Sequence, residues 1–423
     1  MVMIARYALI VLSVMIMALF IPMLSDMAFG DRSMKTQLFY SPVKEDFIWR
    51  DKMPKGMEAD PQEKHHVQFL ITDKSGQTYK RQDFEKMLPF IYYKNMELWG
   101  MLPLELKGQK FDKAAIKSSR QVIELKPENL PENTIGDEIY PLIESVPDGV
   151  RLVLPDDRFR IGERIEFVNA DSNSVDEELS VKYTDALKSA GFVFPGEFVG
   201  GKSSILKPFD EGVFLKDKNG ALFHLKRVRG NPLVVNTEVT PGGGVRFVKV
   251  SENKRKEFYG VLLSNTGELY MLGYDNYKLT PLPLKGYNPD TMDFKMIFNP
   301  LYRTATYSDN NLIRAVVMDD QYKEIDYMEH IMPWTQPTEM QRVVSYLLSY
   351  RVTLKGENSD FLKLSFAGFG VYSLISAVVC VLIYAAVAFR RKENFRFILA
   401  DSGLILLSGV YGLIAVFLIP YEK

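Results

Sequence analysis

The sequence has very little cysteine: Cys380 is the only one among 423 residues, and it lies inside a long apolar run. The polar part of the chain therefore has neither disulfides nor a cysteine metal site. Histidine is also scarce, with four residues, and no cysteines or acidic residues accompany them at ligand spacing. No nucleophile motif marks a catalytic site either. We therefore predict no metal, no cofactor and no catalytic residues.

An excess of charge of either sign is also absent. Lysine and arginine number 52, and aspartate and glutamate number 53. A balanced chain has no global field to attract nucleic acid, so we expect no nucleic-acid partner. A mean hydropathy of -0.08 with 47% hydrophobic residues is typical of a polar globular body that carries a few membrane helices.

Long apolar runs are present in three places, and each could cross a hydrocarbon core of about 30 Å as a helix. They are Met1–Leu24, Phe366–Phe389 and Phe397–Pro420. We expect residues 1–24 to form an uncleaved transmembrane anchor and residues 366–420 to form a transmembrane helical hairpin. A cleaved signal peptide is the alternative for the first run, but Ser25–Phe29 offers no good small-x-small cleavage site.

A basic loop, residues 390–396, separates the last two runs. It carries Arg390, Arg391, Lys392 and Arg396, and positive charge of this kind stays in the cytoplasm. Arg6, the only charge in the first run, indicates the same side for the N-terminus. We therefore expect the lipid bilayer to be a partner of this protein. We expect a multi-pass protein of the inner membrane whose large middle region and C-terminus are extracytoplasmic (periplasmic).

Residues 30–337 are predicted to be mainly β. Apolar strands flank glycine turns at Gly76, Gly220 and Gly267, and a weaker copy turns at Asp319–Asp320. The later turns recur at about 50 residues, which favours an irregular β-propeller-like extracytoplasmic domain. A β-sandwich, or a pair of smaller β domains, is the alternative. A further hairpin is expected from strands 150–154 and 165–168.

Helices are expected in few places of the middle region. The apolar spacing predicts short helices at 82–88 and 175–190, the second capped by Asn173 or Ser174. Residues 338–360 are expected to form a connecting amphipathic helix and a linker, with a capping box at Thr338 and Gln341.

One nucleotide-binding motif is matched letter for letter. Residues 196–203 read G-x-x-x-x-G-K-S. A phosphate-binding loop must lead into a helix, and Pro208 leaves no room for one after Ser203. The predicted topology also places the motif outside the cytoplasm. We therefore expect no nucleotide binding at 196–203.

Asp401 is the ionisable residue of greatest interest, because it lies inside the third apolar run. Buried acids in membrane helices are often functional, but Asp401 could also reach Arg396, Lys392 or the headgroups as an interfacial anchor. Both interpretations stay open. Nearby Ser408, Gly409 and Gly412 allow close helix contact, either within the hairpin or with a partner subunit.

Three segments carry a resemblance: residues 167–176, 183–192 and 207–216. Together they resemble a domain-of-unknown-function family of inner-membrane proteins from Bacteroidetes-type bacteria. The resemblance extends over nearly the whole chain. It implies an envelope role beside ABC-type transport components, and therefore a membrane-protein partner such as an ABC transporter permease.

These observations predict a non-enzymatic, membrane-anchored accessory or interaction subunit of an envelope membrane complex, with an ABC-type transporter as the candidate complex. The first alternative is a membrane-anchored propeller hydrolase or lyase that acts on an envelope polymer. The second is an extracytoplasmic sensor that signals through a partner, because the cytoplasmic segments are too short to hold an output domain.

Overall fold

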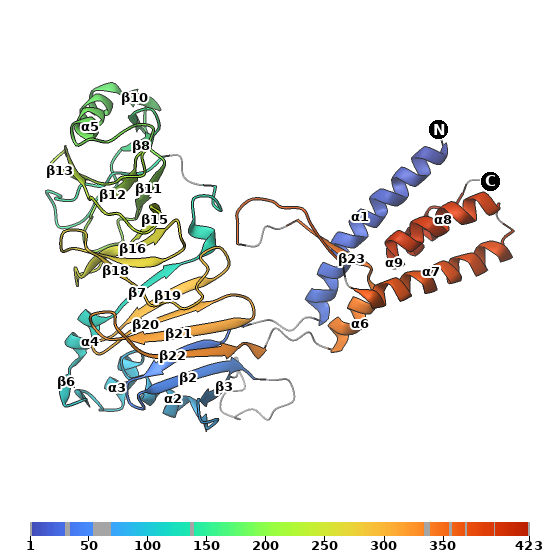
Figure 1. The fold of residues 1–423 in the computed structure, drawn as a ribbon, viewed down its shortest axis with the longest axis horizontal. Helices are drawn as coiled ribbons and strands as arrows, with labels where there is room; N and C mark the ends of the chain where they lie inside the picture. Colours follow the sequence, from blue (N-terminus) through green and yellow to red (C-terminus); the bar gives the residue numbers. More distant parts are fainter. Residues whose placement is uncertain are drawn as a thin grey trace. The chain divides into compact units, whose positions relative to one another are not determined.

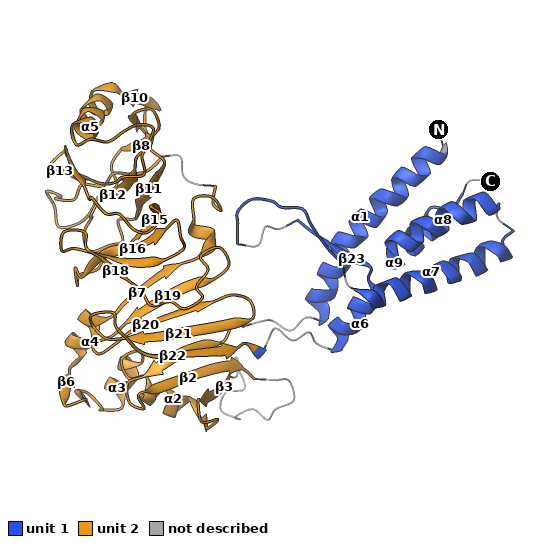
Figure 2. Ribbon diagram, in the orientation of Figure 1, with its two compact units in different colours: residues 1–34, 333–423 blue, residues 35–332 orange. Residues whose placement is uncertain are grey.

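The computed structural model describes residues 2–29, 34–53, 69–135, 139–333, 339–354, 358–368, 370–392 and 394–421. The chain divides into two compact units (Figure 2). Unit 1 comprises residues 1–34 and 333–423, and unit 2 comprises residues 35–332.

Within the described residues, unit 2 has five antiparallel sheets of three or more strands, four of them from strands consecutive in the sequence. Sheet 1 contains β1 (Gln37–Ser41), β2 (Asp46–Lys52), β3 (Phe69–Asp73) and β4 (Thr78–Tyr79). Sheet 2 contains β8 (Asp157–Ile161), β9 (Ile165–Asn169) and β10 (Ser174–Asp176). Sheet 3 contains β11 (Phe198–Gly201), β12 (Val213–Lys216), β13 (Leu222–Val228) and β14 (Asn231–Asn236).

The last two sheets follow the same pattern, with one addition. Sheet 4 contains β15 (Val245–Val250), β16 (Phe258–Ser264), β17 (Leu269–Gly273) and β18 (Leu279–Pro281). Sheet 5 contains β19 (Asp293–Phe298), β20 (Arg303–Ser308), β21 (Leu312–Met318) and β22 (Glu324–Ile331). The earlier strand β7 (Gln121–Leu125) joins the outer side of β19, so sheet 5 has five strands. None of these sheets closes on itself.

The sheets are layered one after another, and the apolar cores lie between them (Figure 1). Sheets 4 and 5 share a core that includes Val261, Phe294 and Tyr307. Sheets 3 and 4 meet around Phe214 and Leu262. Further cores join sheet 2 to sheet 3, and β1 packs on β20 and β21. The prediction of a mainly β unit is confirmed.

Turn chemistry explains the hairpins that the sequence predicted. Gly267 has φ +86°, and its amide donates to the Ser264 carbonyl at 3.0 Å. Gly220 has φ +82° after Asp217, whose carboxylate accepts from the Ala221 amide at 2.8 Å. A residue with a side chain would be strained at either φ, so glycine fixes these turns.

The predicted strand at 150–154 is wrong. The strand that pairs with β9 is β8, which begins at Asp157 within the expected turn. Val150 and Val153 are exposed, whereas Phe159 is fully buried in the core between sheets 2 and 3. Burial of the Phe159 ring therefore determines the position of this strand more strongly than the apolar valines before it do.

Helices in unit 2 are short. They are α2 (Arg81–Met87), α3 (Tyr93–Leu98), α4 (Lys113–Ser119), the 3-10 turn η2 (Pro127–Asn129) and α5 (Glu177–Ser189). A small hairpin joins β5 (Leu104–Leu106) to β6 (Gln109–Phe111). The expected helix at 175–190 is present as α5. Its cap is Asp176 rather than Asn173 or Ser174, because the Asp176 carboxylate accepts from the Leu179 amide at 2.9 Å.

Unit 1 is mainly helical. Its elements are α1 (Val2–Phe29), α6 (Glu339–Leu347), β23 (Tyr350–Thr353), β24 (Ser365–Gly368), α7 (Val371–Arg390), α8 (Phe395–Ser408) and α9 (Val410–Leu418). Among the described residues, two helices are long and apolar enough to cross a membrane: Met3–Phe29 and Val371–Arg390. The protein is therefore consistent with membrane association through two helices.

The predicted third span, Phe397–Pro420, is wrong. Gly409 has φ +59° and ends α8, and α9 runs back beside it as a short helical hairpin (Figure 1). The ring of Tyr421, beyond α9, stacks on Phe397 near the start of α8 at 4.1 Å. The described C-terminal end, at Tyr421, therefore lies beside the start of α8, which directly follows the basic loop.

The connecting region also differs from its prediction. The helix α6 is present, but strand β23 lies within the expected linker and pairs with β24, which lies beyond residue 360. Phe366 lies on β24, so α7 begins five residues later, at Val371. Thr338, the expected cap, lies outside the described residues.

Candidate functional site

The most unusual site in the protein is a buried ion pair inside unit 1. Arg6 on α1 and Asp401 on α8 form a bidentate pair, with Nη1–Oδ1 and Nη2–Oδ2 distances of 2.9 Å. Asp401 is fully buried and Arg6 is 7% exposed. Two parallel charge-assisted hydrogen bonds fix the geometry of the pair as well as its charge balance. The site therefore joins the N-terminal helix to the C-terminal hairpin.

Tyrosines from neighbouring elements complete this site. Tyr384 on α7 donates to Asp401 Oδ2 at 2.9 Å, and the Tyr421 hydroxyl lies 3.4 Å from Oδ1. The Tyr421 hydroxyl also lies 2.5 Å from that of Tyr7, while its ring lies 3.5 Å from the Arg6 guanidinium. Ring and cation at this distance attract each other. We call these five residues the Arg6–Asp401 cluster.

The third nitrogen of the Arg6 guanidinium, Nε, binds the end of the hairpin. Arg6 Nε donates to the carbonyl of Ile419 at 3.0 Å, just after the last turn of α9. This carbonyl would otherwise be an unsatisfied helix-end acceptor in an apolar environment. The cluster therefore satisfies its charges and closes a helix end at the same time.

Periodic burial explains why these side chains meet. On α1, Arg6 is followed at intervals of four residues by buried Ile10, Val14 and Ala18. On α8, Asp401 lies between buried Ile398 and Ile405. Residues three or four apart share one face of a helix, so both charges lie on inward faces.

The small residues singled out in the sequence form the tip of the hairpin. A Cβ at Gly409 would overlap Ser349 Oγ, and one at Gly412 would overlap Ser408 Oγ. The Ser408 hydroxyl donates to the Leu404 carbonyl within α8, at 2.6 Å. These residues therefore allow close contact within unit 1, the first of the two roles expected for them.

The basic loop lies at the same end of unit 1 as the cluster. Arg390, Arg391, Lys392 and Arg396 are all exposed, and none forms an ion pair within the described residues. Asp401 is bound to Arg6 instead of the expected Arg396 or Lys392. In the sequence, Arg6 indicated only the side of the membrane, and no pattern indicated that Tyr7, Tyr384 and Tyr421 belong to the site.

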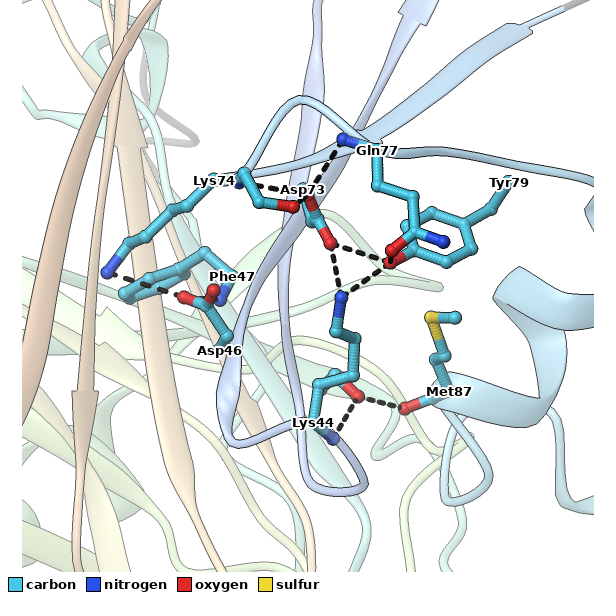
Figure 3. A network of polar contacts seen from close by, with 10 residues as sticks. Lys44, Asp46, Phe47, Asp73, Lys74, Gln77, Tyr79 and Met87 are labelled. Carbon is cyan, nitrogen blue, oxygen red and sulfur yellow. Dashed lines mark hydrogen bonds and ion pairs between the residues drawn. The ribbon is translucent and has the colours of Figure 1, made fainter.

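A second polar cluster closes a turn of sheet 1 (Figure 3). The Asp73 carboxylate accepts from Lys44 Nζ, from the Tyr79 hydroxyl at 2.6 Å and from the Gln77 amide at 3.1 Å. Burial opposes ionisation of Asp73, but the hydrogen bonds from Lys44, Ser75 and Tyr79 outweigh it and lower its pKa. Because both carboxylate oxygens are occupied, this cluster stabilises the turn between β3 and β4.

A third cluster is buried next to β12 and β15. Lys207 Nζ lies 2.6 Å from both Asp210 Oδ2 and Glu252 Oε1, and all three side chains are almost fully buried. Burial raises the pKa of Glu252, although Lys207 acts in the opposite direction. Two carboxylates that share one ammonium make this a structural ion cluster within the core of unit 2.

The G-x-x-x-x-G-K-S motif has the wrong local structure for a phosphate loop. Its residues 198–201 form strand β11, paired with β12, and residues 204–212 contain no helix. Within the described residues, no three histidine, cysteine, aspartate or glutamate side chains lie close enough together to hold a metal ion.

The sequence of the chain matches a known protein family. Residues 37–318 match the family described as domain of unknown function DUF4857. The chain belongs to the DUF4857 family. The match covers most of unit 2 and confirms the expected kinship to a domain of unknown function. No curated protein matches this DUF4857 protein.

Proposed function

We propose that this DUF4857 protein is a non-enzymatic accessory subunit of an envelope membrane complex, anchored in the inner membrane through unit 1. An ABC-type transporter, suggested by the family resemblance, is the candidate complex. In this proposal unit 2 is extracytoplasmic and carries the contacts with other envelope proteins.

The closed state of the Arg6–Asp401 cluster is the observation that carries this proposal. Both carboxylate oxygens and all three guanidinium nitrogens are bound by groups of the chain itself. A catalytic or transporting charge needs access to its substrate, whereas a closed pair holds helices together. The geometry therefore favours an anchor over an enzyme or a transport path.

Exposed apolar surface supports a place among lipids and partner helices. On α7, Leu374 and Leu382 are more than 60% exposed, and on α1 Ile4 is 77% exposed. Water-exposed surface of this kind would promote aggregation, whereas hydrocarbon or another helix covers it without cost. The two helices then have an inward face for the cluster and an outward face for the membrane.

Charge placement supports the orientation. Arg6 and the basic loop lie at one end of unit 1, and positive charge stays in the cytoplasm. The C-terminal Tyr421 lies at that same end. We therefore propose that both termini are cytoplasmic.

A propeller-like interpretation of unit 2 belongs to the same proposal. Four sheets are successive antiparallel meanders that pack face to face, as propeller blades do. The N-terminal sheet 1 packs on the C-terminal sheet 5, which is also how a propeller joins its first blade to its last. We propose an irregular, open relative of the propeller.

Crosslinking inside the membrane tests the accessory role. A photoreactive residue at Leu382, on the exposed face of α7, should give one defined adduct with a second membrane protein in intact cells. The same residue at Leu12 probes the exposed face of α1. Adducts with lipid alone at both positions, together with recovery of the protein as an unaccompanied monomer, would contradict the proposal.

A further inference from the structure

Two cavities of unit 2 meet along strand β7. The first, of about 730 Å³, lies over the exposed face of sheet 5 and is bordered by β1. The second, of about 450 Å³, is bordered by β7, β11 and β15. Both are lined by Val122, Glu124 and Lys126. The two cavities are therefore neighbours along β7, and we call them together the β7 groove.

The groove is bordered by strands with an open edge. β1 is the end strand of sheet 1, and β7 is the end strand of sheet 5. Five consecutive residues, 35–39, line the first cavity. Residues 37–39 belong to β1, and because side chains alternate between the two faces of a strand, three in a row that line one cavity indicate that the backbone edge faces it. An extended chain could therefore pair with β1 inside the groove.

The groove carries an excess of positive charge. Seven cationic and three anionic residues line it. Each acid is neutralised by one lysine, at 2.7 to 3.1 Å, in the pairs Lys295–Glu124, Lys35–Asp293 and Lys126–Glu128. Four cations remain without a carboxylate partner among the described residues: Arg50, Arg120, Lys202 and Lys249.

Two of these cations face an electrostatic cost. Lys249 is half-buried, and its Nζ has only a 3.5 Å contact with Asn129 Oδ1. Burial lowers the pKa of Lys249 and the nearby charge of Lys202 lowers it further, which together outweigh the opposite effect of Glu124. A bound carboxylate between the two ammonium groups would relieve both the burial cost and the repulsion.

Apolar side chains are interspersed with these charges on the floor of the groove. Val122 is 49% exposed although it lies within a strand, and Ile297 on the neighbouring β19 is half-buried. A strand with alternating acidic and apolar side chains would match this surface.

We propose that the β7 groove binds an extended acidic peptide segment of a partner protein, which adds as a strand along β1 and places its carboxylates on Lys202, Lys249, Arg50 and Arg120. This deepens the proposed function, on which it rests, by naming the surface and the chemistry of the partner.

Binding of a synthetic peptide tests the proposal. The probe is a fluorescein-labelled eight-residue peptide that alternates glutamate and valine, and fluorescence anisotropy with the full-length protein in nanodiscs reports its affinity. The double variant Lys202→Gln/Lys249→Gln should weaken binding by roughly tenfold or more, because it removes two charges that face the ligand. The matched control Lys218→Gln/Lys323→Gln, at exposed positions outside the groove, should bind as the native protein does.

Two further probes separate backbone pairing from charge alone. A peptide of the same sequence with alternate amides methylated keeps its carboxylates but cannot pair with β1, so it should lose binding. Equal binding of this peptide, equal displacement by inorganic polyphosphate, or equal affinity of the two double variants would each overturn the proposal.

The peptide-binding experiment and the crosslinking test of the accessory role can fail independently of each other. Peptide binding is measured with purified protein alone, so it can succeed even if no membrane protein crosslinks to Leu382. Conversely, a crosslinked partner without peptide binding would leave the accessory role standing and remove only the groove.

Discussion

At the scale of single residues, the two charges that lie within the apolar N-terminal and C-terminal runs are partners. A lone arginine in the first run and a lone aspartate in the last are each costly in hydrocarbon, and their pairing removes most of that cost. Both occupy helix-period positions next to buried aliphatic residues, on α1 and α8. That signal was readable from the sequence, whereas the contributions of Tyr7, Tyr384 and Tyr421 depend on the hairpin turn and were not.

A double-mutant cycle tests the pair. Arg6→Met or Asp401→Leu alone should lower the stability of unit 1 by about 3 kcal/mol or more, because each leaves an uncompensated buried charge. The double variant should lose less than either single one, since no charge remains unpaired. Detergent-induced unfolding of the purified protein measures these differences. Additive losses would show that the two side chains do not interact.

Burial also determines the protonation of His224 in unit 2. Its Nε2 lies 2.5 Å from the Glu211 carbonyl, which can only accept, so Nε2 carries the proton and Nδ1 accepts from the Tyr277 hydroxyl at 3.0 Å. Burial lowers the pKa of His224 to about 3, from an ordinary value of 6.5. The native state therefore keeps this ring neutral.

The consequence is a pH-dependent stability of unit 2. Between about pH 6.5 and pH 3 the unfolded chain binds a proton at His224 that the native state does not. The free energy of unfolding should therefore fall with decreasing pH, with His224 contributing about 1.4 kcal/mol per pH unit. His224→Phe, which retains an aromatic ring against Phe214, should show a shallower fall when chemical unfolding is followed from pH 6 to pH 4. Equal slopes would contradict this assignment.

At the scale of elements, local turn chemistry explains what could be predicted. Hairpins with a glycine at positive φ, such as β16–β17, were readable because the turn and the apolar strands specify the same structure. Strand β8 was missed because its burial depends on sheet 3, and α3 and α4 are too short to show a period. Hydropathy could not separate a third span from the α8–α9 hairpin, since both bury apolar side chains.

Gly409 makes that hairpin possible, and its replacement tests it. Gly409→Ala should destabilise unit 1 by about 1–2 kcal/mol from its positive φ alone, and further through overlap with Ser349. Gly403→Ala is the matched control within α8, where a Cβ meets nothing within 4 Å, and should stabilise by up to about 1 kcal/mol. Detergent unfolding compares the two. A continuous helix through 409 would tolerate both substitutions equally well.

At the scale of the whole molecule, the central claim is the placement of the two units across the membrane. Both membrane-length helices are in unit 1, where Arg6, the basic loop and Tyr421 lie at one end. The family match covers most of unit 2. In the proposed function, the closed polar cluster belongs to a membrane anchor, and the positively charged groove of unit 2 is the surface that binds a partner.

Reporter fusions test this placement most directly. Green fluorescent protein after Lys423 should fluoresce and alkaline phosphatase there should be inactive, because in the proposed topology the α8–α9 hairpin returns the C-terminus to the cytoplasmic side. Alkaline phosphatase inserted at the exposed turn Arg229–Gly230 of unit 2 should be active. Active phosphatase at the C-terminus would mean that the last apolar run crosses the membrane. An inactive phosphatase at Arg229–Gly230, with a fluorescent fusion at the same turn, would contradict the extracytoplasmic placement of unit 2.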